Sequence, residues 1–317
     1  MALPTDPKAL ALGKDLVQVL DDLNGVHPGY RPAHAKGILF SGVFTPSKEA
    51  PSLTRAVHAQ QASTPVTVRF SDSAGFPTVA DNDPMFASPR GIAIRFHLAT
   101  HVHTDIIAHS TDGFPVRTAE EFLVFLRALQ TSGPSAPKPT PIESFLATRP
   151  RALAFVQAPK PIPSSFARES FYSVNALKFT NREGANRFGR YRILPHAGRD
   201  PLDPAAAAAK GPNFLFDEIA ARVSAGPVKF HIRVQLAAAS DVVDDASIPW
   251  PDDRTQLPFG AIALTQHVAD DPNEQRKIIF DPIPRTDGIE PSGDPLLEPR
   301  ATVYLLSGRR RRAAAAQ

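Results

Sequence analysis

Residues 298–311 read Glu-Pro-Arg-Ala-Thr-Val-Tyr-Leu-Leu-Ser-Gly-Arg-Arg-Arg. If this segment is helical, Arg300, Tyr304, Ser307 and Arg311 lie on one face, because three- and four-residue intervals bring side chains together. An arginine one turn before a tyrosine favours the phenolate over the neutral phenol, whose pKa is normally about 10. Ionisation at neutral pH needs a shift of roughly 3 units, or about 4 kcal/mol, so a metal cation would have to assist the arginine. An amphipathic helix with a solvated basic end is the alternative for these residues alone.

Three short runs precede this segment and connect it to a known family. They are Ile-Phe-Asp-Pro at 279–282, Gly-Ile-Glu-Pro-Ser at 288–292 and Asp-Pro-Leu-Leu at 294–297. Their order and spacing resemble those of haem catalases, which end this run with Arg-x-x-x-Tyr. In catalases the tyrosine is the proximal ligand of the haem iron. The resemblance implies that Tyr304 is the iron ligand and that Arg300 is its charge partner.

A second resemblance lies near the N-terminus, where residues 31–37 read Arg-Pro-Ala-His-Ala-Lys-Gly. Taken alone, a histidine in such a segment is more often packed or solvated than catalytic. Catalases, however, present their distal histidine in an Arg-x-x-His-Ala-Lys-Gly sequence. The resemblance therefore implies that His34 is the general acid and base and that Arg31 contacts a haem propionate.

Residues 65–71, Pro-Val-Thr-Val-Arg-Phe-Ser, alternate as a half-buried strand does. The run resembles the Val-Arg-Phe-Ser strand of catalases, and residues 88–96 resemble the strand that follows it. The resemblance implies that Arg69 binds a propionate, which suits a guanidinium because it can contact both oxygens of a carboxylate. It also implies that the Ser71 hydroxyl orients the distal histidine.

Residues 105–111, Asp-Ile-Ile-Ala-His-Ser-Thr, depart from the family's Asp-Leu-Val-Gly-Asn-Asn-Thr. We expect Ser110 to stand where the second asparagine donates a hydrogen bond to peroxide, with His109 as the alternative donor. A serine is shorter and has one rotatable donor instead of two fixed ones. This change puts the oxidation of a second peroxide in doubt and favours a peroxidase over a catalase.

Two further cofactor contacts are expected from the resemblance. The segment 114–129 is predicted to be helical after Thr118, which can begin a capping box. Phe122 in this helix would place its ring over a haem pyrrole, although an ordinary core position explains it as well. Arg311 shares the face of Arg300 and Tyr304, so we expect it to contact a propionate, with a neighbouring arginine as the alternative.

The composition narrows the classes of function. The 317 residues include no cysteine, which excludes disulfides, thiolate haem ligands and thiol catalysis. The net charge of +3 is concentrated in the run at 309–312, so it does not indicate a nucleic-acid-binding surface. The N-terminus lacks a basic and apolar signal sequence, and no apolar run approaches the roughly 20 residues of a membrane span. We therefore expect a cytoplasmic protein without a membrane span, and a homo-oligomer stays possible.

The order of predicted elements indicates an α+β fold. Helices are expected at 7–22, 142–157 and 214–224, and strands at 171–176, 188–194, 228–236, 259–266 and 276–280, with a loop at 205–209. Period-two strands with few helical crossovers predict an antiparallel barrel or sandwich flanked by helices. The resemblance, which covers about 31–311, implies the catalase barrel and its C-terminal proximal helix. We expect a single domain, 1–317, with an N-terminal helical arm at 1–25 and a disordered tail at 313–317.

The functional expectation is a member of the minimal-catalase or catalase-related peroxidase branch. The resemblance implies haem b with ferric iron, hydrogen or organic peroxides as oxidants, and a small organic electron donor. A true catalase is one alternative. A catalase-like hydroperoxide isomerase of the allene oxide synthase type is another. Ala33 argues against this isomerase, since such enzymes tend to carry threonine immediately before the distal histidine. A haem-binding protein without turnover, or a haem-free barrel, is the third.

Overall fold

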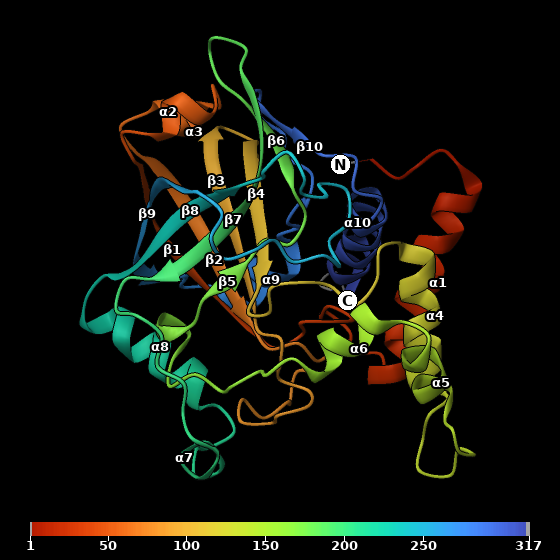
Figure 1. Ribbon diagram of the computed structural model, residues 1–317. Helices are drawn as coiled ribbons and strands as arrows, with labels where there is room; N and C mark the ends of the chain where they lie inside the picture. The colour runs from red at the N-terminus through yellow and green to blue at the C-terminus, as the bar shows by residue number, and fades with distance from the viewer. Residues whose placement is uncertain (1, 315–317) are drawn as a thin grey trace.

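The computed structural model describes residues 2–314, and within this range the centre of the fold is an eight-stranded antiparallel barrel (Figure 1). The strands follow the order β7-β5-β4-β3-β2-β1-β9-β8, and β8 pairs back with β7 to close the ring. Two short strands, β6 and β10, continue the ladder from β7. The strands are β1 (Gly37–Pro46), β2 (Thr64–Ser71), β3 (Gly91–Ala99), β4 (Val102–His109), β5 (Phe171–Tyr172), β6 (Leu177–Thr180), β7 (Asn186–Pro195), β8 (Val228–Leu236), β9 (Gln256–His267) and β10 (Ile289–Pro291). The predicted α+β class and antiparallel barrel with flanking helices are confirmed.

Alternation of apolar and polar residues explains why these segments form a barrel. In β8, Val228, Phe230 and Ile232 are buried while the residues between them are exposed. A strand's side chains point to alternate faces, so one face fills the barrel and the other meets solvent. Burying each large apolar side chain contributes about 1.5–3 kcal/mol. The interior is rich in aromatic rings, among them Phe40, Phe44, Phe70, Phe96, Phe166, Phe171, Phe230 and Phe259.

Helices gather on one side of the barrel and enclose the space beside it (Figure 1). This group contains α1 (Pro7–Asn24), α4 (Ala119–Gln130), α5 (Pro141–Ala147), α6 (Pro150–Gln157) and α10 (Leu297–Ala314). The remaining helical segments are α2 (Ala50–Leu53), α3 (Val57–Gln60), the 3-10 turn η1 (Phe166–Arg168), α7 (Pro204–Ala208), α8 (Phe214–Ala225) and α9 (Asp271–Lys277). No helix within residues 2–314 is long and apolar enough to cross a membrane.

The first and last helices pack against each other closely. Gly13 permits this approach, since a Cβ there would lie 2.5 Å from Thr302 Cγ2 of α10. Asp21 of α1 also forms an ion pair with Arg310. The Asp6 side chain accepts a hydrogen bond from the Lys8 amide and caps the start of α1, where Pro7 fits the first turn. The two ends of the chain therefore form one wall together.

Several predicted elements differ from the observed ones. The helix expected at 142–157 is divided into α5 and α6, because Arg149 before Pro150 takes a non-helical conformation. The loop expected at 205–209 is helix α7, which Asp203 caps. Residues 276–280 are not a strand, since Arg276 and Lys277 end α9. The strand at 171–176 is confined to Phe171–Tyr172. Helix α10 includes Ala313 and Ala314 of the expected tail, whose residues 315–317 lie outside the described range.

His58 is a histidine inside the barrel core, with 1% of its surface exposed. Its ring centroid lies 4.8 Å from that of Phe96 and 5.6 Å from that of Phe259. Its Nδ1 has no hydrogen-bond partner among the described residues. Burial lowers the pKa of His58 from 6.5 to about 4, because the imidazolium would lose its hydration.

We predict that His58 makes the fold sensitive to acid. The unfolded chain takes up this proton below about pH 6.5, whereas the folded chain resists it down to about 4, so stability is lost as pH falls through this window. In His58→Leu, the decrease in unfolding free energy between about pH 7.5 and 5 should be smaller than in the parent by about 2 kcal/mol. Urea denaturation at both pH values measures it. Equal decreases in the two proteins would contradict the prediction.

Candidate functional site

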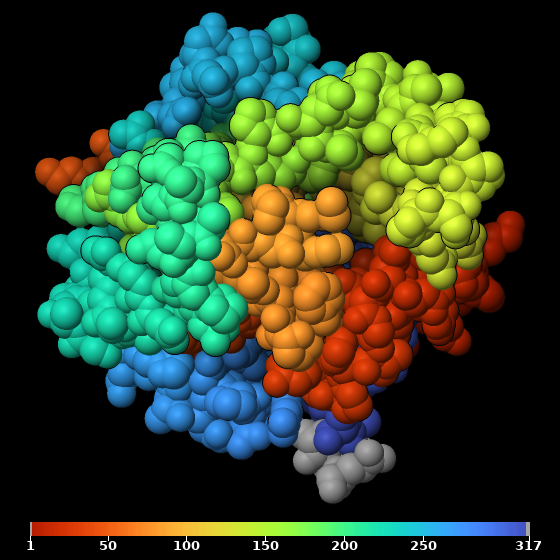
Figure 2. All heavy atoms as spheres, turned by 90° about the horizontal axis from the view of Figure 1, so that it is seen from below, coloured from red at the N-terminus to blue at the C-terminus, as the bar shows by residue number. Residues whose placement is uncertain are grey.

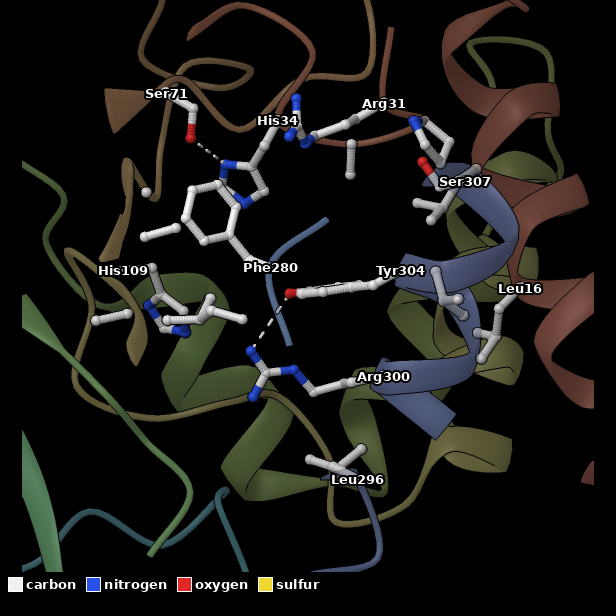
Figure 3. Close-up of a pocket in the computed structure, with 18 of the residues that line it drawn as sticks. Leu16, Arg31, His34, Ser71, His109, Phe280, Leu296, Arg300, Tyr304 and Ser307 are labelled. Carbon is white, nitrogen blue, oxygen red and sulfur yellow. Dashed lines mark hydrogen bonds between the residues drawn. The ribbon is translucent and has the colours of Figure 1, made fainter. Parts of the chain in front are cut away.

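A cavity of about 270 Å³ lies between the barrel and helices α1, α4 and α10 (Figure 3). The expected site residues Arg31, His34, Arg69, Ser71, Phe122, Arg300, Tyr304 and Arg311 all line it. Most of the remaining wall is apolar and includes Leu16, Leu20, Ile92, Ile107, Phe114, Val174, Phe280, Leu296 and Val303. Leu16 and Arg311, which are 295 positions apart in the sequence, thus line the same cavity.

Tyr304 projects from α10 into the middle of the cavity (Figure 3). Arg300, one helical turn earlier, donates a hydrogen bond from Nη2 to the Tyr304 hydroxyl at 3.3 Å. Arg300 also donates from Nη1 to the side chain of Asn175, which in turn donates to Asp294 Oδ2 at 2.7 Å. This chain of contacts fixes the guanidinium beside the phenol oxygen.

Asn175 was not assigned a role from the sequence. It falls in the run Phe-Tyr-Ser-Val-Asn-Ala at 171–176, which resembles a catalase strand, so the signal was present. The sequence did not show that Asn175 binds Arg300, because the two residues lie 125 positions apart.

His34 lies toward the side of the cavity that the Tyr304 hydroxyl faces (Figure 3). Its backbone has a φ of 56°, which is unusual for a residue other than glycine and carries a strain of roughly 1–3 kcal/mol. The His34 amide donates to the Ser73 carbonyl at 2.8 Å, and its Nδ1 lies 3.1 Å from the Ser71 hydroxyl oxygen. Burial and then the charge of Arg69 lower the pKa of His34 to about 4. A neutral imidazole is therefore held in place here.

Gly91 gives His34 the space it occupies. A Cβ on Gly91 would lie 2.6 Å from Ser71 Oγ and 3.0 Å from His34 Nδ1. The first distance is too short for a real Cβ contact and the second is tighter than most, so the serine and the histidine would have to shift if Gly91 carried a side chain.

Three arginines, Arg31, Arg69 and Arg311, lie close to one another in the wall of the cavity. Burial lowers the pKa of each guanidinium below its usual value. Their charges add to this effect: Arg69 lowers the pKa of Arg31, Arg311 lowers the pKa of Arg69, and Arg31 lowers the pKa of Arg311. The protein acceptors that they reach are mostly neutral carbonyl and side-chain oxygens, and Asp271 is the carboxylate that offsets the charge of Arg31 and Arg69. Among the described residues, the buried Arg311 Nε finds no partner at all. This end of the cavity therefore fits a group with more than one negative charge.

The residues as a set fit a haem. A phenol oxygen backed by an arginine suits ferric iron, and the arginine cluster suits the two propionates. Phe122 lines the apolar part of the cavity, with its ring stacked on that of Phe125 at 6.1 Å between centroids. The flat apolar macrocycle of a haem would contact apolar side chains in this part of the cavity.

The expectation for Ser110 is wrong in its placement. The Ser110 hydroxyl accepts a hydrogen bond from the Arg90 amide at 3.0 Å. Among the described residues, His109 lines the cavity and Ser110 does not. Adjacent residues of an extended chain point to opposite sides. A shift of one position in matching this segment to the family therefore selects Ser110, which does not line the cavity, in place of His109, which does.

Comparison with known proteins agrees with this geometry. The sequence model of the catalase family matches residues 16–317. A catalase-related peroxidase of Mycolicibacterium paratuberculosis is 34% identical over 92% of this chain and 92% of its own length. A catalase-related peroxidase of Synechococcus elongatus is 31% identical over 92% of this chain and 86% of its own.

Longer catalases share the same fold. The solved structures of a fungal and of a bacterial catalase each superpose with a TM-score of 0.78 at 21% identity and cover 93% of this chain. The chain spans only 62% and 60% of those two proteins, and 54% of the catalase of Sus scrofa. Because the family match covers nearly the whole chain and two relatives exceed 30% identity over most of their lengths, the protein belongs to the catalase family.

Proposed function

We propose that the protein is a haem-dependent peroxidase that uses hydrogen peroxide or organic peroxides to oxidise small organic donors, with weak catalase activity. One observation carries the proposal: a single cavity combines a tyrosine backed by an arginine, a neutral histidine held by a serine, and an arginine cluster. The two relatives of similar length are both named catalase-related peroxidases, which supports the choice of peroxidase over catalase.

The cofactor that we assign is haem b, with Tyr304 as the ligand of its ferric iron. Arg31, Arg69 and Arg311 would hold the propionates, and the ring of Phe122 would pack against the macrocycle. When bound, haem supplies the redox chemistry, since it accepts oxidising equivalents from peroxide and passes them to the donor. The protein's own groups bind, orient and move protons around it.

His34 is the group that moves the proton. The Ser71 hydroxyl can accept a hydrogen bond from His34 Nδ1–H. In that tautomer Nε2 carries a lone pair, which can take a proton from peroxide and then return it to the departing oxygen. The low pKa of His34, about 4, keeps this nitrogen unprotonated at neutral pH. General acid and base catalysis of this kind contributes typically 10²–10⁴ in rate.

Arg300 stabilises negative charge on the Tyr304 oxygen through its hydrogen bond. Asn175 and the buried Asp294 hold the guanidinium from the other side, so the cation cannot turn away from the phenol. A preorganised charge of this kind acts without reorganisation at the moment of reaction.

Small molecules need a route to the cavity. Figure 2 shows a hollow on the lower face, bordered by the segment around residues 75–90 (orange), the N-terminal segment (red) and the segment that contains α4 (yellow). Leu20 of α1 and Ala119 of α4 line the cavity. We assign this opening to peroxide and to the organic donor.

Tyr304→Phe removes the oxygen that we assign as the iron ligand. We expect the variant either to lose haem or to give a different optical spectrum after reconstitution with ferric haem. Tyr172→Phe is the matched control, because Tyr172 also lines the cavity, and it should keep the parent spectrum. A parent-like spectrum in Tyr304→Phe would rule out this residue as the ligand.

His34→Ala should retain haem but react with hydrogen peroxide at least ~10² more slowly, the lower bound for a lost general acid and base. Stopped-flow absorbance measures the rate, and the exposed His97→Ala on the outer face serves as control. A variant that reacts as fast as the parent would show that another group moves the proton.

Gly91→Ala tests whether the His34–Ser71 pair must be placed this closely. The new Cβ would push both side chains away, and misplacement of a reacting group by about 1 Å can cost up to roughly 10²-fold in rate. We expect about a 10- to 100-fold slower reaction with peroxide, at unchanged haem content. Gly133→Ala, where the added Cβ meets no atom within 4 Å, should react like the parent. Equal rates in all three proteins would contradict the prediction.

A further inference from the structure

A second cavity, of about 380 Å³, lies beside the proposed haem site and is lined by several groups with N–H donors. Three of them are arginines: Arg95 of β3, Arg285 of the segment that follows α9, and Arg312 of α10. Two are histidines, of which His101 lies in the turn between β3 and β4 and His103 lies in β4 itself. The proposed peroxidase reaction gives none of these five residues a role.

Each of the three arginines is held by part of its guanidinium, and the rest is free. Arg95 donates from Nε and Nη2 to the two carboxylate oxygens of Asp105 at 2.9 and 2.7 Å. Arg285 donates from Nε to Asp281 Oδ2 at 2.7 Å. Arg312 donates from Nε and Nη2 to a backbone carbonyl oxygen at 3.0 and 2.6 Å. Within residues 2–314, the other terminal nitrogens have no hydrogen-bond partner: Arg95 Nη1, Arg312 Nη1 and both Nη atoms of Arg285. Fixed guanidinium groups with free N–H donors suit the oxygens of a phosphate.

The carboxylates near this cavity are already paired. Asp281 lines the wall, where one of its oxygens accepts from a backbone amide at 3.0 Å and the other from Arg285. Asp105 accepts from Arg95 with both oxygens. Three arginines against two carboxylates leave one positive charge in excess, and it belongs to Arg312, whose described partner is a neutral carbonyl. An anion can therefore bind here without breaking an ion pair.

The same cavity has an apolar part, formed by Val102, Ile279 and Leu305. Val102 is 49% exposed, so this surface meets water when nothing covers it. An inorganic ion would leave it uncovered, whereas a ligand with an apolar portion would remove it from water, which is favourable. The combination of arginines and apolar side chains therefore fits an organic anion better than an inorganic one.

The backbone of residues 277–279 connects this cavity to the arginine cluster of the proposed haem site. Arg312 donates to the first of its three carbonyl oxygens and Arg95 to the third. The middle carbonyl accepts from Arg31 at 3.2 Å and from Arg311 at 2.8 Å. Arginines of both cavities thus hold one short stretch of chain. If a ligand in one cavity changes the affinity of the other cavity for its ligand, the effect is reciprocal.

We propose that this second cavity binds a small organic phosphate monoester, whose phosphoryl group contacts the guanidinium groups of Arg95, Arg285 and Arg312. His101 and His103 add N–H donors to the same group, and the apolar wall covers the organic part. A phosphate monoester carries close to two negative charges at neutral pH and offers three acceptor oxygens, which matches several separate donors. The inference goes beyond the proposed function, because this binding needs neither haem nor peroxide.

Isothermal titration calorimetry of the haem-loaded protein with phenyl phosphate and with inorganic phosphate, at constant ionic strength, tests the site. We expect phenyl phosphate to bind at least about fourfold more tightly, the effect of burying roughly one additional methylene group. Arg312→Gln should weaken phenyl phosphate binding by roughly 10- to 150-fold, the effect of one lost charge-assisted hydrogen bond. Arg309→Gln is the matched control: it removes the same charge from an exposed position of α10 outside the cavity, and it should stay within about twofold of the parent.

His101→Gly removes a donor without a risk to folding. The backbone of His101 has a φ of 60°, which glycine adopts at no steric cost, so the melting temperature should stay equal or rise. We expect phenyl phosphate binding to weaken by roughly 2- to 12-fold, the effect of one lost neutral hydrogen bond. Thermal unfolding and the same titration measure the two effects in one protein.

Several results would overturn the proposal. Phenyl phosphate that does not bind the parent, or binds no more tightly than inorganic phosphate, would do so. Unchanged affinity in Arg312→Gln or in His101→Gly would also do so, because both side chains are assigned to the phosphoryl group. Equal weakening in Arg312→Gln and Arg309→Gln would show a general effect of charge and not a site. A parent that binds phenyl phosphate as expected but takes up no haem would contradict the proposed function alone.

Discussion

The mutual repulsion of Arg31, Arg69 and Arg311 is the constraint on which the rest of this structure depends. Buried guanidinium groups lose their hydration, and an ion left without a counter-charge in such a place is strongly unfavourable. The three come from the loop after α1, from β2 and from α10, so the chain brings distant segments together at this point. Gly37 makes room for one of them, since a Cβ there would lie 2.1 Å from Arg69 Nη2. Such an arrangement favours a ligand with more than one negative charge at this end of the cavity.

The barrel and the last helix contribute to the cavity in different ways. Strand register places Ser71, Gly91 and His109 in one row, so the barrel fixes the hydroxyl and the open position beside which the His34 ring lies. Helix α10 presents Tyr304 and Arg300 from the other wall and is held by α1 through Asp21 and Arg310. A rigid sheet and a clamped helix can keep reacting groups at constant separation, which catalysis by positioning requires.

Much of this arrangement could be predicted from sequence, and the failures have physical causes. Strands such as 228–236 alternate clearly, and the Arg300/Tyr304 spacing follows from helix geometry. The resemblance alone predicted that these two residues share a site with His34, since no local pattern encodes proximity across 270 positions. Ser110 was the wrong choice because a shift of one residue reverses the face of an extended chain. The break at Pro150 was overlooked although proline restricts the residue before it.

Resonance Raman spectroscopy of the protein reconstituted with ferric haem tests the central claim, that Tyr304 binds the iron, most directly. Excitation into a phenolate-to-iron transition enhances vibrations of the ligated ring. The account predicts tyrosinate ring bands that shift when the protein is grown with ring-deuterated tyrosine. A haem protein whose enhanced bands are insensitive to that label would contradict it, because the iron would then be held by a group other than a tyrosine.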